Sequence, residues 1–253
     1  MTNYLAFDIE TAKITPQDSD VQQHRPLGIA CWAVAWVGSE TTILHKGEAE
    51  EQEFRIKTTE GCGKGFDGEI LPQMTKSQCC LLVARLHRAV EQGFTLLAHN
   101  GVGFDFDILA EESGMHDTCA DLALHSVDTC LLVHCLKGFP VGLEAIAKGM
   151  NLQGKTEGMN GSMAPQMWAE GKFNEVLEYV AQDVRATLQV ALEIEKRKGL
   201  TWIAKSGRRN SLPIPKLLTA FEALQLPEPD TSWMSEPISR ERFTSWMEAQ
   251  REV

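Results

Sequence analysis

Two carboxylates lie two residues apart near the N-terminus, Asp8 and Glu10 in the segment YLAFDIET. Side chains that alternate with a period of two predict a β-strand, with Leu5, Phe7 and Ile9 on one face and both carboxylates on the other. Neighbouring carboxylates on a rigid strand repel each other unless a cation lies between them, and hard divalent cations prefer oxygen ligands. The alternative is a half-exposed edge strand with a polar face. Further candidate ligands elsewhere in the chain are needed to distinguish a metal site from such a strand.

A second polar segment is HNGVGFDFD, residues 99–107, which follows a predicted strand over residues 95–98. Its glycines let the backbone turn tightly after that strand, and a helix is predicted from about Phe104 to Glu112. Asp105 near the helix start is placed to project back over the edge of the sheet. The helix dipole by itself would also favour an aspartate at this position.

A third segment is the longest predicted helix, Asn174 to Lys196. Tyr179 and Asp183 are four residues apart and therefore lie on one face, one turn from each other. They border the apolar stripe of this helix without belonging to it. The alternative is a tyrosine and an aspartate at the solvent edge of an ordinary amphipathic helix.

The elements around these segments indicate the fold. Three early strands joined by short links, over residues 4–11, 28–37 and 41–46, predict an antiparallel meander. Residues 47–74 lack periodicity and are predicted to be a loop or insertion. A capping box at residues 75–78 predicts the start of a helix, and strands over 95–98 and 126–128 then alternate with helices. We therefore expect an α/β protein with a ribonuclease H-like mixed five-stranded sheet flanked by helices, and Asp8 and Glu10 at its middle.

The three segments together resemble the exonuclease motifs of the DnaQ-like superfamily, in order and in spacing. These motifs are FDIET at residues 7–11, Asn100-x-x-x-Phe104-Asp105, and Tyr179-x-x-x-Asp183. The tyrosine-containing (DEDDy) branch is indicated, because the histidine of the other branch would fall at Glu178. The exonuclease domains of family B DNA polymerases are the most similar group. The resemblance covers roughly residues 1–195.

This resemblance implies a site with two divalent ions, Mg²⁺ or Mn²⁺, which suit oxygen ligands. Asp8 would bridge both ions, Glu10 and Asp183 would complete the water-activating site, and Asp105 would hold the second ion. Tyr179 would orient the attacking water. Thr11, His99, Asn100 and Phe104 are the candidate substrate contacts, with two alternatives: His99 and Asn100 only fix the loop, or Phe104 belongs to the core. Asp107 is offset by two residues from Asp105 and is the less favoured ligand, and Asp128 is expected to cap a helix.

The net charge of −11 lies entirely in residues 1–198, since residues 199–253 hold seven basic and seven acidic residues. We expect a ribonuclease H-like domain over residues 1–198 and a mostly irregular C-terminal extension over residues 199–253 that packs on it. Residues 196–209 carry six basic residues and no acidic one, so they either follow a nucleic-acid backbone or form a solvated turn. The odd number of cysteines, without a C-x-x-C pair, favours a reduced cytoplasm. No apolar run is long enough for a membrane span.

We expect a metal-dependent 3′–5′ exonuclease that acts on single-stranded ends and releases nucleoside 5′-monophosphates, with DNA favoured over RNA. An exoribonuclease that trims RNA 3′ ends is the nearest alternative. A catalytically inactive module that binds nucleic acid or protein is the alternative from another class. Protein partners, pathway and oligomeric state do not follow from the sequence.

Overall fold

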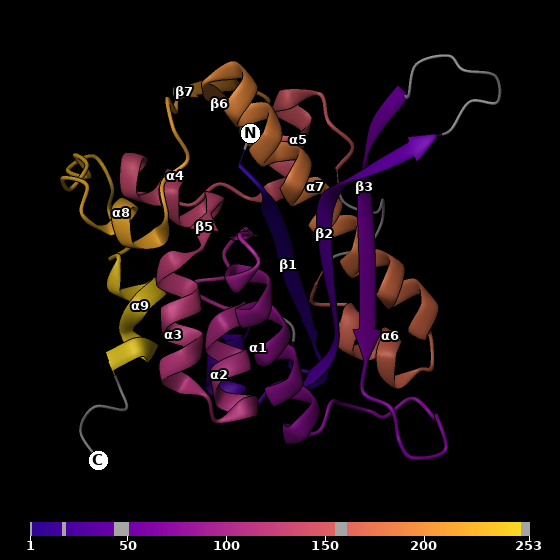
Figure 1. Ribbon diagram of the computed structural model, residues 1–253. Helices are drawn as coiled ribbons and strands as arrows, with labels where there is room; N and C mark the ends of the chain where they lie inside the picture. Colours follow the sequence, from indigo (N-terminus) through magenta and orange to yellow (C-terminus); the bar gives the residue numbers. More distant parts are fainter. Residues whose placement is uncertain (1, 17–18, 43–50, 155–160, 249–253) are drawn as a thin grey trace.

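The computed structural model describes residues 2–16, 19–42, 51–154 and 161–248. Five strands form a mixed sheet in the order β3-β2-β1-β4-β5 (Figure 1). Their bounds are Tyr4–Thr11 (β1), Ile29–Thr42 (β2), Glu51–Cys62 (β3), Thr95–Ala98 (β4) and Val127–Asp128 (β5). β1 is antiparallel to β2 and parallel to β4, and β5 continues parallel to β4. The predicted ribonuclease H-like α/β fold is confirmed, with β1 at the centre of the sheet.

The prediction for the third strand was wrong in its position. Thr41 and Thr42 belong to β2, and residues 43–46 lie outside the described residues. The third strand, β3, lies within residues 47–74, for which a loop was predicted, and it pairs antiparallel with β2 from Glu51 to Cys62. β3 is an edge strand, which needs few apolar residues, and its charged sequence EQEFRIKTTEGC hides the alternation. The antiparallel meander itself is present.

Helices cover both faces of the sheet. Alternate residues of β1 contact different layers: the Phe7 ring lies 5.6 Å from the ring of Phe106 in α2, whereas the Tyr4 hydroxyl donates to Glu195 of α7. α1 (Lys76–Glu91), α2 (Asp105–Ser113) and α3 (His116–His125) gather on the Phe7 side, and α7 (Phe173–Arg197) packs across β1, β2 and β3. β1 is therefore covered on both faces, and all of its residues except Asp8 are buried.

The predicted capping box at the start of α1 is present, with Thr75 accepting from the Gln78 amide and Gln78 accepting from the Thr75 amide. The remaining helices of the central part are α4 (Thr129–Lys137), α5 (Leu143–Met150) and α6 (Ala164–Ala169), and a 3₁₀ turn, η1, spans Val21–His24. α3 and α6 were not predicted, because a ten-residue and a six-residue helix offer little periodicity to detect.

The C-terminal residues contain a two-stranded hairpin, β6 (Gly199–Ile203) and β7 (Arg209–Pro213), followed by α8 (Ala220–Leu224) and α9 (Glu241–Glu248). The hairpin approaches α5 closely: a Cβ on Gly149 would lie 2.3 Å from the Thr201 carbonyl oxygen. Only glycine fits there, so α5 and β6 are packed backbone against backbone.

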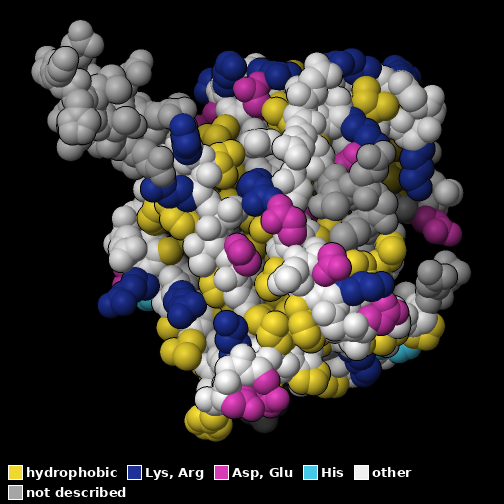
Figure 2. Space-filling view, turned by 90° about the vertical axis from the view of Figure 1, so that its right-hand side faces the viewer, with side chains coloured by type: hydrophobic (Ala, Val, Ile, Leu, Met, Phe, Trp, Pro, Cys, Tyr) yellow, Lys and Arg dark blue, Asp and Glu magenta, His cyan; other side chains and the backbone are white. Residues whose placement is uncertain are grey.

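Acidic and basic side chains are interspersed on the face that carries β3 and α6 (Figure 2). Among the helices of the described ranges, none is both long and apolar enough to cross a membrane. All seven cysteines lie in described segments, and each is free.

Candidate metal centre and substrate cleft

Three carboxylates meet between β1 and α7. Asp8 and Glu10 share the face of β1 that points to α7, and Asp183 lies in the middle of that helix. One oxygen from each of Asp8, Glu10 and Asp183 can be chosen so that all three lie within 4.8 Å of one another. Glu10 and Asp183 are buried and Asp8 is partly exposed. Such a spacing allows one cation to contact all three side chains.

Asp105 joins this group from the other side of β1. The Ile9 amide donates a hydrogen bond to Asp105 Oδ1 at 2.9 Å, which fixes this carboxylate next to Asp8. The turn before α2 makes the placement possible, because Gly101 passes so close to Ala98 that a Cβ there would lie 2.5 Å from the Ala98 Cβ. The structure therefore brings together the four carboxylates that the sequence motifs indicate as ligands.

The electrostatics of this cluster favour a bound cation. Burial and the charges of Asp105, Glu10 and Asp183 raise the pKa of Asp8 well above its ordinary value. Burial also raises the pKa of Asp105 to about 6, although the Ile9 amide stabilises its charged form. A divalent cation would relieve this repulsion, and the ligand atoms are all oxygens, which is the donor set that Mg²⁺ and Mn²⁺ prefer. The residues present therefore fit such ions.

Tyr179 lies one turn before Asp183 on α7 and is almost completely buried, with 1% of its surface exposed. Glu178, where the other exonuclease branch has histidine, is ion-paired with Arg185 and its side chain is 68% exposed. Glu178 is thereby directed away from the carboxylate cluster. Thr11 ends β1 beside a register shift and is buried.

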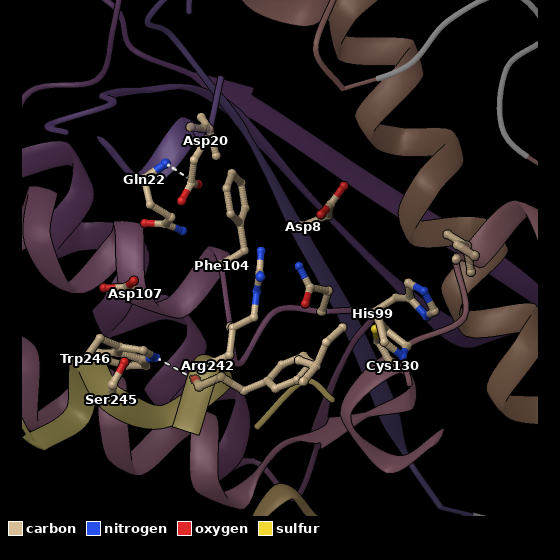
Figure 3. A pocket seen from close by; sticks show the side chains of 18 of the residues that line it. Asp8, Asp20, Gln22, His99, Phe104, Asp107, Cys130, Arg242, Ser245 and Trp246 are labelled. Atoms are coloured by element: carbon tan, nitrogen blue, oxygen red, sulfur yellow. Dashed lines mark hydrogen bonds between the residues drawn. The ribbon is translucent and has the colours of Figure 1, made fainter. Parts of the chain in front are cut away.

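A cavity of about 910 Å³ opens next to the carboxylates (Figure 3). Asp8 and Asp183 line it, and so do His99, Asn100 and Phe104, three of the four residues predicted to contact the substrate. Thr11, Glu10, Asp105 and Tyr179 are not part of the lining. The cavity is thus lined by Asp8 and Asp183 of the cluster, whereas Glu10 and Asp105 do not contribute to its surface.

Several lining residues were not predicted. Thr187 follows Asp183 by one helical turn and could have been found from that spacing. Arg242, Phe243 and Trp246 come from α9, and Figure 3 shows the Arg242 side chain extending from α9 into the cavity, away from Trp246. Nothing in the sequence connects α9 to this site, because its place depends on the tertiary fold.

Two further aspartates near the site have other partners. Asp107 forms an ion pair with Arg25, which also binds Glu111 at 3.2 Å. Asp128 caps α4 and binds the loop after β4. Its carboxylate accepts from the amides of Asn100, Val102, Cys130 and Leu131 at 2.9–3.0 Å. These bonds use both oxygens of Asp128, so its role here is to hold the loop that carries His99 and Asn100.

Comparison with known proteins finds a family match over part of the chain. Residues 124–205 match the family model described as a predicted 3′-5′ exonuclease related to the exonuclease domain of PolB. This part of the chain, about a third of its length, is similar to that family of predicted 3′–5′ exonucleases. The match agrees with the predicted relationship to the exonuclease domain of family B polymerases, and the matched family is one of predicted 3′–5′ exonucleases. The match includes α7 with Tyr179 and Asp183, and it does not reach Asp8, Glu10 or Asp105.

Among solved structures, the chain is similar to the family B DNA polymerase from the hyperthermophilic archaeon Pyrobaculum calidifontis. The identity is 16%, the TM-score is 0.45, and the similarity covers 77% of this chain and 24% of the polymerase chain. This chain therefore corresponds to about a quarter of that polymerase. No curated protein matches the chain.

Proposed function

We propose that this protein is a metal-dependent 3′–5′ exonuclease that removes nucleotides from single-stranded nucleic acid, with DNA preferred to RNA. The observation that carries the proposal is the convergence of Asp8, Glu10 and Asp183 within 4.8 Å, with Asp105 fixed beside them. A protein that only bound nucleic acid would have no need of four repelling carboxylates at the end of a cleft.

Asp8, Glu10, Asp105 and Asp183 would together hold two divalent ions. Bound ions would activate the attacking water and stabilise the leaving 3′ oxygen in an in-line displacement. Mg²⁺ and Mn²⁺ both suit this ligand set.

The chain's own groups would position the reacting bond. Asp8 and Asp183 line the cavity and would face the terminal phosphodiester, while the buried phenol of Tyr179, one turn from Asp183, would orient the water. Asn100, His99 and Phe104 would contact the terminal nucleotide, with the Phe104 ring available to stack on a base. Attack on phosphorus releases a nucleoside 5′-monophosphate and leaves a new 3′ hydroxyl.

Single-stranded ends are favoured because the reacting bond must enter a cleft beside buried carboxylates, and unpaired bases can separate and stack on aromatic side chains. The preference for DNA and a cytoplasmic location are parts of the same proposal, and both are open to direct measurement.

The test is degradation of 5′-labelled single-stranded DNA and RNA oligonucleotides by the purified protein with Mg²⁺ or Mn²⁺. We expect a ladder that shortens from the 3′ end, stops on addition of EDTA, and is faster for DNA. Asp8→Asn should lower the rate by roughly 10³-fold or more, since removal of a metal-binding carboxylate costs several kcal/mol of transition-state stabilisation.

Asp117→Asn is the matched control, because it removes one carboxylate from the exposed N-terminal turn of α3. This variant should cut at the wild-type rate. If wild type and Asp8→Asn both fail to degrade the DNA and the RNA oligonucleotides, the exonuclease proposal is refuted. Faster degradation of RNA than of DNA would favour the ribonuclease that trims RNA 3′ ends.

A further inference from the structure

A second hollow, of about 650 Å³, lies between the end of α4, the β6–β7 hairpin and the segment before α9. Its lining combines basic and aromatic side chains: Lys137, Phe139, Trp202, Arg208, Arg209 and Trp233. We call this group the basic-aromatic hollow. It is separate from the carboxylate cluster, and the exonuclease motifs account for none of its residues.

The basic members of the hollow are available to an anion. Lys137, Arg208 and Arg209 are exposed, and none of their side chains takes part in an ion pair or hydrogen bond with the described part of the chain. Asp230 is the acidic residue of the lining, and its carboxylate accepts from the Ser232 amide at 3.0 Å. On a chain with a net charge of −11, three adjacent cations without carboxylate partners indicate an anionic ligand.

The aromatic members form a cluster of rings in edge-to-face contact, and one of these rings, that of Trp233, is exposed. The Phe139 ring lies 6.4 Å from that of Trp202 and 5.9 Å from that of Trp233, both edge to face. Trp233 remains 65% exposed, and its indole N–H donates to the Asp230 carbonyl, which fixes the ring. A positioned, exposed tryptophan beside cations is suited to stacking on a nucleobase whose phosphates contact those cations.

The hollow is continuous in sequence with the substrate cleft. Phe139 lines the hollow, and the next residue, Pro140, lines the cavity beside the carboxylates. α4 makes the same connection, since Cys130 lies in the cavity lining and Lys137 in that of the hollow, about 10 Å further along the helix axis. The two sites therefore lie on either side of one short segment.

From these contacts we infer that the basic-aromatic hollow binds the upstream part of a single strand whose 3′ end lies at the carboxylate cluster. The inference rests on the proposed exonuclease function and adds a second contact region to it. Lys137, Arg208 and Arg209 bind phosphates, and Trp233 stacks on a base. Oligonucleotides long enough to reach both sites are then better substrates than those that occupy the cleft alone.

The test compares kcat/KM for the first cleavage of a DNA trimer and a 20-mer by the full-length protein. Wild type should favour the 20-mer by tenfold or more. Arg208→Ala/Arg209→Ala should lose most of this advantage and leave the trimer unchanged, and Trp233→Ala should lose roughly 5- to 100-fold on the 20-mer alone. Lys76→Ala/Arg88→Ala, two cations on the exposed side of α1, is the charge-matched control and should retain the advantage.

Binding of a fluorescent 20-mer in EDTA provides a readout that does not require hydrolysis. The Arg208→Ala/Arg209→Ala variant should bind about tenfold more weakly, with a log–log salt slope that is about 1.4 less steep. Binding and kcat/KM equal to those of the control variant would overturn the inference. If the wild-type protein cuts no oligonucleotide, the exonuclease proposal is refuted. If the Arg208→Ala/Arg209→Ala variant then still binds the 20-mer more weakly than wild type, the hollow remains a nucleic-acid site.

Discussion

Asp8 owes its environment to three elements that bring negative charge to one strand residue: its own strand with Glu10, the start of α2 with Asp105, and the middle of α7 with Asp183. Alternation along the strand predicted that Asp8 and Glu10 share a face, and helical spacing predicted that Tyr179 and Asp183 do. The meeting of the three segments followed from the family resemblance, since no local pattern specifies which helix crosses which strand.

Asp105 should make the metal-free protein less stable as pH rises. Its pKa of about 6 in the folded state exceeds the ordinary value of 3.8, so the folded state binds more protons than the unfolded state between those values. The free energy of unfolding therefore falls as pH increases from about 4 through 6. In EDTA, Asp105→Asn should become more stable than wild type across this window, by on the order of 1–3 kcal/mol at pH 7.

Urea unfolding at several pH values measures this difference. The asparagine amide oxygen can still accept the Ile9 N–H, so the comparison isolates the charge. Saturating Mn²⁺ should reverse the order at pH 7, since wild type gains more binding energy than the variant. A difference between wild type and variant that does not depend on pH would contradict the assignment.

Arg242 should act as a phosphate contact within the cleft. Its guanidinium extends into the cavity and makes no ion pair or hydrogen bond with the described side chains, although four acidic residues line the same cavity: Asp8, Asp20, Asp107 and Asp183. Arg242→Ala should raise KM for oligonucleotides about tenfold, because a charge-assisted contact contributes roughly 1.5 kcal/mol, with little change in kcat.

Hydrolysis of the p-nitrophenyl ester of thymidine 5′-monophosphate serves as the second readout, since this ester has no upstream phosphate. Arg242→Ala should hydrolyse it at the wild-type rate, and Arg242→Lys should recover part of the oligonucleotide affinity. Arg88→Ala on α1 removes the same charge away from both sites and should change neither reaction. A fall in ester hydrolysis would mean that Arg242 acts on the carboxylate cluster instead.

Among the elements, α7 was the easiest to predict and β3 the hardest. α7 buries a continuous apolar stripe over 25 residues, so its periodicity and both of its site residues were evident. β3 pairs along the outer edge of β2, where backbone hydrogen bonds to one neighbour suffice and side chains stay mixed. Apolar periodicity arises where one face of an element is buried, and an edge strand such as β3 has little buried surface. The same limit applies to α9, whose contribution to the cleft depends on contacts with residues far away in the sequence.

The loop after β4 shows how one residue can hold an element in place. Asp128 accepts four amide hydrogen bonds, two from residues 100 and 102 and two from the first turn of α4. Asp128→Ala would leave these donors with fewer partners in a buried position, so we expect it to lower the free energy of unfolding by roughly 2–4 kcal/mol.

The activity of the folded fraction should also fall, because His99 and Asn100 lose their support, while stabilisation by Mn²⁺ should persist. Thermal unfolding with and without Mn²⁺ distinguishes an aspartate that holds the loop by hydrogen bonds from one that binds the metal. An Asp128→Ala variant with wild-type stability that no longer responded to Mn²⁺ would identify Asp128 as a metal ligand and contradict the structural role.

In the molecule as a whole, the C-terminal residues share the core of the preceding domain. Leu200, Trp202, Ile214, Leu217 and Phe243 are all buried, and the Ala220 amide donates to the Ser126 carbonyl next to β5. The boundary at residue 198 is thus a change in composition, across which apolar packing continues. The charges also differ along the sequence: residues 1–198 hold the whole acidic excess, whereas the basic-aromatic hollow is built largely from C-terminal residues.

Removal of α9 alone should distinguish its contribution to the substrate cleft from its contribution to the stability of the core. Arg240 anchors the segment before α9 by donating to the carbonyls of Leu224, Leu226, Cys135 and Pro227, so a chain that ends at Arg240 keeps this anchor. It loses Phe243, which packs 4.9 Å from the ring of His134, and Trp246, which donates to the Val102 carbonyl. We expect the shortened protein to fold with a stability loss of about 2–3 kcal/mol, mostly from Phe243.

Because the four carboxylates lie on β1, α2 and α7, the shortened protein should still be stabilised by Mn²⁺ and should hydrolyse the thymidine ester at a rate close to wild type. Its kcat/KM for a 20-mer should fall below that of Arg242→Ala, since the wall of the cleft is lost together with the charge. A kcat/KM equal to that of Arg242→Ala would mean that Arg242 accounts for the whole contribution of α9 to oligonucleotide cleavage. Loss of ester hydrolysis in a folded, Mn²⁺-responsive protein would instead show that α9, through Trp246 and the Val102 carbonyl, holds the loop that positions Asp105.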